Sequence, residues 1–379
     1  MPKIYELLGY PVSDNSPAVV ESRKKAFCPF IADKCDGGGN RYMSDIDLKD
    51  HPELEKLFPG MSCIPSGVCS VQITDKQAPW IICPRRLLYM GKKATNEVLN
   101  GTTQTKLLEK CSFPVGTEVG IWAEVKVRYT NDVNDVNDDR GENSSASAFD
   151  YTFDYVLMPL GKVTQDEAVR ATGMSWQVLE KSLRDSGHTF AMRDGKTYIE
   201  DFPTDTPVIV EVMTSSTSGG SKKKRSCIPQ AFEDCMLGKP HMAPGINYRQ
   251  VWARMSSQLI VKSQPAMAWG GKTIWVLQDL LADYISTSTA LDLRKFVAEH
   301  TDEVNILAFS YGNKYRQTEQ SKTVSLDNST LYAGPIKASG EGTVKPCFQD
   351  IVLTSVCPPE SVLITALSKK ALANRIVIL

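Results

Sequence analysis

The sequence lacks three features that would assign a protein to a broad class at once. No run of about 18 or more apolar residues occurs in its 379 residues, which argues against a membrane-spanning helix. Residues 1–8 contain no basic segment followed by an apolar one, so the start does not resemble a secretory signal. The formal net charge of −1 excludes a protein that coats nucleic acid through an overall positive field. We therefore expect a cytoplasmic globular protein that does not bind membranes.

Cysteine, in contrast, is abundant. The chain has 10 cysteines, and because thiols stay reduced in the cytoplasm, metal binding is the first explanation to consider. Five of them fall in the segment from Cys28 to Cys83, and a proline directly follows the first and the last of these five cysteines. This pattern predicts an N-terminal loop-rich unit that is organised around a metal rather than around a hydrophobic core.

Four of these five cysteines have a spacing that suits one tetrahedral site for Zn²⁺ or a single iron ion. Cys63 competes with Cys69 for the third position, and we favour Cys69 because a glycine turn, Gly67, precedes it. The predicted ligands are Cys28, Cys35, Cys69 and Cys83. The other cysteines outside the segment are predicted to be free buried thiols: Cys111, Cys227, Cys235, Cys347 and Cys357.

Apolar segments in the middle of the chain predict an α/β core. Strands are expected at 119–129, 149–160, 206–213 and 273–277, because these segments are rich in β-branched and aromatic residues or alternate between apolar and polar. A helix is expected at 247–262. Its apolar face is formed by Val251, Trp252, Met255, Leu259 and Ile260. Strands that alternate with a helix favour a mixed sheet flanked by helices.

Two of the predicted strands carry a carboxylate in an apolar setting, at Asp154 and Glu211. A buried carboxylate is costly unless it is paired or binds a metal, and phosphodiester hydrolysis uses Mg²⁺ held by one or two carboxylates. Asp154 and Glu211 are therefore candidate catalytic residues and Mg²⁺ ligands. Glu124 is a third acidic candidate, and the carbonyl of Val212 is a further ligand candidate. The alternative is that both carboxylates lie at an edge or on the surface.

The segment after Glu211 suits contact with a phosphate backbone. Small polar residues fill 214–221, and four cations follow: Lys222, Lys223, Lys224 and Arg225. Amides, hydroxyls and cations are the groups that contact DNA phosphates. A solvated loop, or a localisation signal, is the alternative interpretation of the four cations.

Two short helices are expected at 164–172 and 175–183, joined at Gly173, and each begins at a hydroxyl residue that can cap it. They lie in an apparent insertion, 162–205, between two strands of the core. The spacing suits a helix-turn-helix that reads DNA bases, and a packed helical hairpin is the alternative.

The order of these motifs resembles that of the NotI-type restriction endonucleases. The resemblance runs from the N-terminus to about residue 280. The segments that carry it are Leu8-Gly9-Tyr10, Cys28-Pro29-Phe30, Gly67-Val68-Cys69, Ile82-Cys83-Pro84, Phe153-Asp154-Tyr155, Val210-Glu211-Val212-Met213-Thr214 and the helix around 251–262. It implies a PD-(D/E)xK nuclease-like core, a homodimer on palindromic double-stranded DNA, and an iron or zinc site of four cysteines that is structural.

Position by position, Asp154 and Glu211 match the metal-binding carboxylates of that family, and Glu124 matches a third acidic residue. The four cysteine ligands of the family fall on Cys28, Cys35, Cys69 and Cys83. The chain departs from the family at Met213, where members place a polar residue, often Gln. Lys222 or the metal alone would then have to compensate. The interval between Asp154 and Glu211 is also longer than in the family.

The sequence thus predicts a Mg²⁺-dependent type II restriction endonuclease. Its expected organisation is 1–105 with the cysteine site, 106–300 as the nuclease core and 301–379 as an extension of the core. The main alternative is a non-catalytic, metal-binding DNA regulator that uses the helical pair as its reader. A repair or homing nuclease with little sequence preference is a second alternative.

Overall fold

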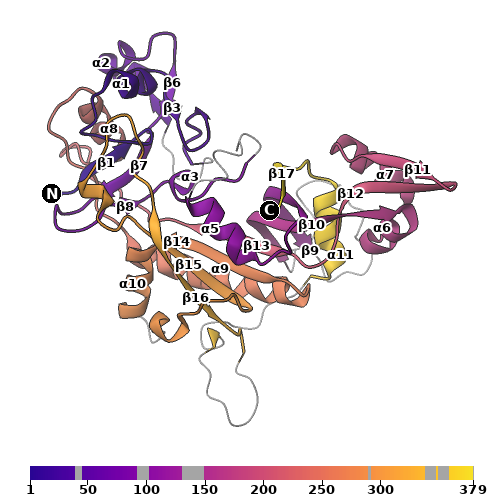
Figure 1. Ribbon diagram of the computed structural model, residues 1–379. Helices are drawn as coiled ribbons and strands as arrows, with labels where there is room; N and C mark the ends of the chain where they lie inside the picture. The colour runs from indigo at the N-terminus through magenta and orange to yellow at the C-terminus, as the bar shows by residue number, and fades with distance from the viewer. Residues whose placement is uncertain are drawn as a thin grey trace.

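The computed structural model describes residues 1–38, 45–91, 102–129, 149–288, 292–337, 347–348 and 358–378, without the side chains of Thr102, Ile260 and Ser288. Its centre is a mixed sheet of nine strands (Figure 1). The strands are β9 (Glu118–Tyr129), β10 (Phe149–Thr164), β11 (Phe190–Arg193), β12 (Lys196–Pro203), β13 (Val208–Met213), β14 (Lys272–Gln278), β15 (Val304–Ser310), β16 (Asp327–Gly334) and β17 (Asn374–Val377).

The sheet is parallel in its middle and antiparallel on both sides. Strands β13, β14 and β15 are parallel neighbours, while β10 is antiparallel to β9, β12 and β13, and β16 is antiparallel to β15. The longer helices are α5 (Thr102–Cys111), α6 (Gln165–Thr172), α7 (Trp176–Asp185), α8 (Ile228–Met236), α9 (Tyr248–Ala268), α10 (Asp279–Ser288) and α11 (Glu360–Ser368). The predicted mixed sheet flanked by helices is confirmed.

Helices cover both faces of the sheet because β13 is apolar on both sides. Val208, Val210 and Val212 pack in the cluster that includes residues of α5. Ile209 faces the opposite side, where residues of α9 and α11 cover the sheet. A strand that is buried on both faces has a nearly continuous run of apolar residues. Both β13 and β14 have such a run, and the sequence therefore predicted them correctly.

The N-terminal lobe has a four-stranded sheet of its own, in the order β2-β1-β7-β8. Its strands and short helices are β1 (Lys3–Leu7), β2 (Tyr10–Pro11), α1 (Pro17–Lys24), β3 (Phe27–Cys28), β4 (Asp33–Lys34), β5 (Asp45–Asp47), α2 (Pro52–Glu55), β6 (Cys63–Pro65), β7 (Val68–Gln72), β8 (Trp80–Ile81) and α3 (Pro84–Leu87). Leu7, Phe58 and Val71 are buried together in this lobe. The expectation of a unit without a hydrophobic core is therefore wrong.

Helix α8 belongs to the same core, although it follows strand β13 in the chain. Its residues Ala231 and Phe232 are fully buried among apolar side chains of the lobe. The chain thus leaves the central sheet after β13, returns to the N-terminal lobe, and re-enters the sheet through α9 and β14. The lobe is not a segment that can be separated from the core at one point of the chain.

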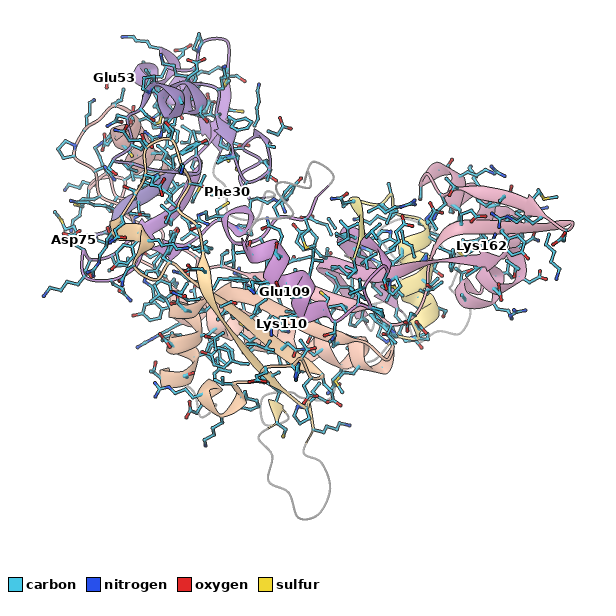
Figure 2. All side chains as sticks on the ribbon, in the orientation of Figure 1. Phe30, Glu53, Asp75, Glu109, Lys110 and Lys162 are labelled. Carbon is cyan, nitrogen blue, oxygen red and sulfur yellow. The ribbon has the colours of Figure 1, made fainter. Side chains whose placement is uncertain are left out.

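The segment predicted as an insertion forms a second lobe. Both expected helices, α6 and α7, are present, and Gly173 between them has a left-handed φ of 70°. Thr164 and Glu167 cap α6 reciprocally. What the sequence reading did not anticipate is the hairpin of β11 and β12, which extends the central sheet beyond β10. Figure 2 shows Lys162 on this lobe, away from Glu53 and Asp75 on the N-terminal lobe.

The C-terminal residues complete the central sheet and its cover. Strand β17 pairs with β9, and Leu363 and Leu367 of α11 are buried against β9 and β10. In the part of the chain that the structure describes, no helix is long and apolar enough to cross a membrane.

A buried carboxylate fastens the second lobe to β17. Asp201 on β12 accepts hydrogen bonds from Nδ1 of His188 at 3.2 Å, from the N–H of Thr189 at 3.1 Å and from Arg375 at 2.6 Å. Burial alone would raise the pKa of Asp201, but the hydrogen bonds from His188 and Thr189 outweigh it and lower the pKa to about 2. The ionised form is therefore strongly favoured in the folded protein.

We expect Asp201→Asn to lower the free energy of unfolding at pH 7 by about 2 kcal/mol. Because the folded pKa lies below the unfolded value, this stabilisation is present above about pH 4 and is lost as the pH falls towards 2. Urea unfolding of both proteins between pH 7 and pH 3 measures it. A difference that stays constant over this range would contradict the assignment.

Candidate active site and cysteine cluster

Asp154 and Glu211 lie next to each other across strands β10 and β13. The ladder between these strands runs as far as the pair Tyr155 and Val210. Beyond it, Oδ2 of Asp154 accepts a hydrogen bond from the N–H of Val212 at 2.8 Å, and the N–H of Asp154 donates to Oε1 of Glu211 at 3.3 Å. Both residues are buried, with 7% and 1% exposed. The alternative that they lie on the surface is excluded.

The regular alternation of side chains between the two faces of the sheet is broken in β10 at Asp154. Phe153 packs on the α9 face of the sheet and Tyr155 on the opposite face, although residues two apart in a regular strand share a face. The partner strand β9 has a matching irregularity at Glu124, whose φ of 54° is left-handed. The register of the β9–β10 ladder is the same on both sides of this point, so both strands deviate together, and the deviation places Asp154 beside Glu211.

A buried lysine that the sequence reading missed completes the group. Nζ of Lys262, on α9, donates to Oε2 of Glu211 at 2.6 Å and to the carbonyl of Thr152 at 2.7 Å. The Lys262 side chain is only 5% exposed. When all three side chains are ionised, Asp154, Glu211 and Lys262 have a combined formal charge of −1.

The environment controls the protonation of Glu211. Burial raises its pKa to about 7, and the nearby charge of Asp154 acts in the same direction. The ammonium of Lys262 opposes both effects. Glu211 therefore depends on a neighbouring positive charge to stay ionised at neutral pH.

Met213 occupies the strand position from which a polar side chain could have reached the site, and the positive charge at Glu211 comes from Lys262 of α9 instead. Its side chain is on the same face of β13 as Glu211, where it packs against Met255 and Leu259 of α9. The position two residues after the glutamate is thus filled by core packing. Lys262 supplies a positive charge at Glu211, a group that the sequence analysis did not name beside Lys222 and the metal as compensation for Met213.

The sequence did contain a signal for Lys262. The buried face of α9 follows residues Val251, Met255 and Leu259, and Lys262 continues this stripe at helical spacing. A lysine in phase with a buried stripe needs a partner. The pattern indicates a buried cation on this helix, although it does not identify Glu211 as the partner.

Glu124 and Val212 have different positions relative to the pair. Glu124 faces Asp154 across the ladder between β9 and β10, but its side chain is exposed. Val212 directs its N–H towards Asp154, and because the N–H and C=O of one strand residue point to the same side, its carbonyl also faces the site. The donor set at the site is therefore two carboxylates and one carbonyl.

The four predicted phosphate-binding cations are not equivalent. Lys222, Lys223 and Lys224 are exposed. The guanidinium of Arg225 is bound at 2.7 Å to both Glu233 and Asp234 of α8. We therefore retain the three lysines as candidate phosphate contacts and withdraw Arg225, because its charge is already neutralised.

The four predicted cysteine ligands line one cavity of about 50 Å³. The cavity is formed by Cys28, Cys35, Cys69 and Cys83, and other lining residues include Asp36, Arg85, Ser215 and Thr217. Burial raises the pKa of the Cys28 thiol to about 12, and the neighbouring Cys83 adds to this shift. All four are free thiols. Cys63 is exposed and outside this cavity, as the preference for Cys69 anticipated.

The thiols share the cavity without the close arrangement of formed ligands. Among the described residues, no group of three or more His, Cys, Asp or Glu side chains is placed to hold a metal ion. Of the remaining cysteines, Cys111 and Cys235 are buried as predicted, while Cys227 and Cys347 are partly exposed, so burial was wrong for these two. Cys227 directly precedes α8, at the end of a surface segment. Cys357 lies outside the described residues.

Two contacts connect the cysteine cavity to the carboxylate pair. Arg85, the second residue of α3 and two positions after Cys83, donates to Asp36 at 2.9 Å and to the hydroxyl of Tyr155 at 3.4 Å. Tyr155 is adjacent to Asp154 in β10. Ser215, which follows β13, donates its N–H to the carbonyl of Ile81 at 3.1 Å. The cavity therefore lies directly behind the end of the strand that carries Glu211.

Comparisons with known proteins do not place the chain in a family. No family model, no curated protein and no solved structure matches it. The functional argument therefore depends on the geometry of the site.

Proposed function

We propose that the chain is a Mg²⁺-dependent type II restriction endonuclease that cuts double-stranded DNA at a specific site. The observation that carries this proposal is the buried group of Asp154, Glu211 and Lys262, in which two carboxylates on neighbouring strands share a site with an ammonium. In this proposal the core is of the PD-(D/E)xK kind, with the lysine moved from the strand to helix α9. A homodimer on a palindromic site is part of the same proposal.

The donor set fits Mg²⁺. The carboxylates of Asp154 and Glu211 and the carbonyl of Val212 are hard oxygen donors, which Mg²⁺ prefers. The formal charge of −1 on the three side chains favours a cation. Bound there, Mg²⁺ would supply a Lewis acid and lower the pKa of an attacking water.

The chain's own residues would position the scissile phosphate and the water. Lys262 keeps Glu211 ionised and can donate a further hydrogen bond to a phosphate oxygen or to the water. Lys222, Lys223 and Lys224, exposed beyond the end of β13, would contact the phosphate backbone. The products expected from in-line attack by water are a 5′-phosphate and a 3′-hydroxyl.

We also propose that the cysteine cavity holds one structural Zn²⁺ or iron ion. Four thiols are a soft donor set that fits either metal. Their raised pKa values mean that binding must release protons, and the binding free energy would then contribute to folding. Through Arg85 and Ser215 the bound cavity would brace the strands that carry the active site.

We expect Cys69→Ser to lose the bound metal, and Cys63→Ser, its matched control, to keep it. The reason is that Cys69 lines the cavity, whereas Cys63 is exposed. Elemental analysis of the purified proteins measures zinc and iron per chain. Equal metal content in wild type, Cys69→Ser and Cys63→Ser would contradict the proposal that the cysteine cavity binds the metal.

The proposed activity is tested on a long, fully sequenced phage DNA, incubated with the purified protein in Mg²⁺ and in EDTA. We expect discrete bands in Mg²⁺ alone, and their sizes give the recognition site. The double variant Asp154→Ala/Glu211→Ala should produce no bands. The matched control is Asp150→Asn, an exposed carboxylate on the same strand, which should cut as wild type does.

Two other results would replace the proposal. A smear of products would indicate a nuclease with little sequence preference. No cutting with any divalent metal, by protein shown to be folded, would favour a DNA-binding regulator without catalytic activity.

A further inference from the structure

The second lobe contains three helices that pack on one another. Helices α6 and α7 are joined by a short turn at Gly173. Helix α11, almost 180 residues further along the chain, packs against both, and its residue Thr365 donates a hydrogen bond to the carbonyl of Thr172 at 3.0 Å. Leu179 and Leu183 of α7 are buried in the apolar cluster that includes α11. One face of α7 is thus fixed on this three-helix core.

A two-stranded hairpin directly follows α7. Strands β11 and β12 pair up to Arg193 and Lys196, and the two residues between them, Asp194 and Gly195, both have a positive φ, of 50° and 73°. This is the geometry of a tight hairpin turn. Arg193 and Lys196 are exposed beside it, and Met192 is 72% exposed. Figure 1 shows this hairpin projecting at the far end of the lobe.

The free face of α7 carries side chains suited to base edges. Gln177, Val178 and Lys181 are exposed on the side of the helix opposite to Leu179 and Leu183. Glutamine can pair with adenine, lysine with guanine, and an apolar side chain can contact the methyl group of thymine. Val178 and Met192 are two of only a few large apolar side chains of the described chain that are well exposed.

Charges in the lobe are arranged to leave some cations available. Glu180 is bound by Arg184 at 2.7 Å, and Glu200 by Arg193 at 3.2 Å and by Lys162 at 3.3 Å. None of the ion pairs of the described residues uses Lys181 or Lys196. The cations and anions between residues 162 and 200 are equal in number, so the lobe lacks the strong positive field of a non-specific DNA binder.

We infer that this lobe is a winged helix-turn-helix unit in which α7 reads bases in the major groove of duplex DNA and the β11–β12 hairpin contacts the adjoining backbone. The inference rests on the proposed function in that DNA is the substrate, but it does not require catalysis. It names the specificity-determining residues Gln177, Val178 and Lys181. It also separates reading from cutting, because α7 and the carboxylate pair are in different parts of the fold.

The fold sets the distance between reading and cutting. Strand β10 continues from Asp154 to Thr164, where α6 begins, with one register irregularity between Gly161 and Val163. Ten residues of strand span at most about 33 Å, which is close to one turn of B-DNA. Helices α6 and α7 follow this strand, so the bases read by α7 should lie on the order of one helical turn of DNA from the scissile bond.

The test uses a randomised library of short DNA duplexes, incubated with the full chain without added Mg²⁺, so that no cutting occurs and no chelator removes the proposed metal of the cysteine cavity. We expect the wild type to enrich one motif. The variant Gln177→Ala/Lys181→Ala should bind the enriched duplex at least about tenfold more weakly in fluorescence anisotropy. The matched control is Lys295→Ala, an exposed cation near β16 at the opposite edge of the sheet, which should bind as wild type does.

The outcomes distinguish this inference from the proposed function. If the double variant, with unchanged circular dichroism and thermal unfolding, enriches the same motif with the same affinity, the reading role of α7 is overturned while cleavage is untouched. If wild type enriches no motif, the inference also fails. If wild type enriches a motif that the double variant loses, but the phage DNA is not cut, the base-reading role of α7 is supported and the proposed nuclease activity is contradicted.

Discussion

Lys262→Met lowers the rate of DNA cleavage about 100- to 1,000-fold in the outcome we expect, with little change in DNA binding. The size is typical of removing one well-placed donor from an active site. Lys262 donates at 2.6 Å to Glu211, whose pKa is raised by burial to about 7. Without the ammonium, Glu211 takes up a proton near neutral pH and no longer offers a negatively charged ligand to the proposed Mg²⁺. Single-turnover cleavage of a duplex that contains the site measures the effect.

A double variant separates chemistry from stability. Lys262→Met alone leaves Glu211 buried without its cation, which destabilises the folded chain. Glu211→Gln/Lys262→Met removes both charges, so we expect it to unfold at a higher urea concentration than Lys262→Met and still not to cut. Cleavage at the wild-type rate by folded Lys262→Met would show that the lysine has no catalytic role.

Glu6→Gln should reduce the free energy of unfolding by about 3 to 5 kcal/mol, the usual cost of breaking a buried ion pair on one side. Glu6 is fully buried and accepts hydrogen bonds from Nε of Arg86 at 2.9 Å, from the hydroxyl of Ser70 at 2.9 Å and from the hydroxyl of Tyr311 at 2.6 Å. These partners come from α3, β7 and the segment just after β15. The substitution leaves the guanidinium of Arg86 buried with no neutralising charge.

Urea unfolding at pH 7 measures this loss, and two variants serve as controls. Glu6→Leu/Arg86→Met removes both buried charges and should recover much of the stability. Glu319→Gln removes one partner of an exposed ion pair with Lys322 and should leave the unfolding midpoint unchanged. If Glu6→Gln and Glu319→Gln behave alike, Glu6 does not hold the N-terminal lobe to the sheet.

The elements that sequence reasoning predicted well are those whose pattern is long and uniform. Strands β9, β10, β13 and β14 and helix α9 all appear close to their expected bounds. The N-terminal lobe was misjudged because its strands are short, from two to five residues, and no periodicity accumulates over such lengths. Its core is assembled from pieces far apart in the chain, including Phe232 of α8.

The candidate site could be predicted only in part, for a related reason. Asp154 and Glu211 were recognisable because each interrupts an apolar strand. Lys262 is 51 positions after Glu211, and only the fold of α9 across the sheet brings the two together. The β11–β12 hairpin, in contrast, was predictable, because Asp194-Gly195 between two short strand-like segments is a strong hairpin signal.

The path of the chain between its lobes has a consequence for how such a protein can diversify. Because α8 lies within the N-terminal lobe while the flanking β13 and α9 lie in the core, a genetic crossover between lobe and core would split a shared interior. The α6–β12 lobe is different, since the chain enters it from β10 and leaves it by β12, which are neighbours in the sheet. Helix α11 shares the interior of this lobe, so under the proposed function new target sequences would be acquired by exchanging α6–β12 with an α11 that still fits, while the cysteine lobe and strands β10 and β13 are inherited as a unit.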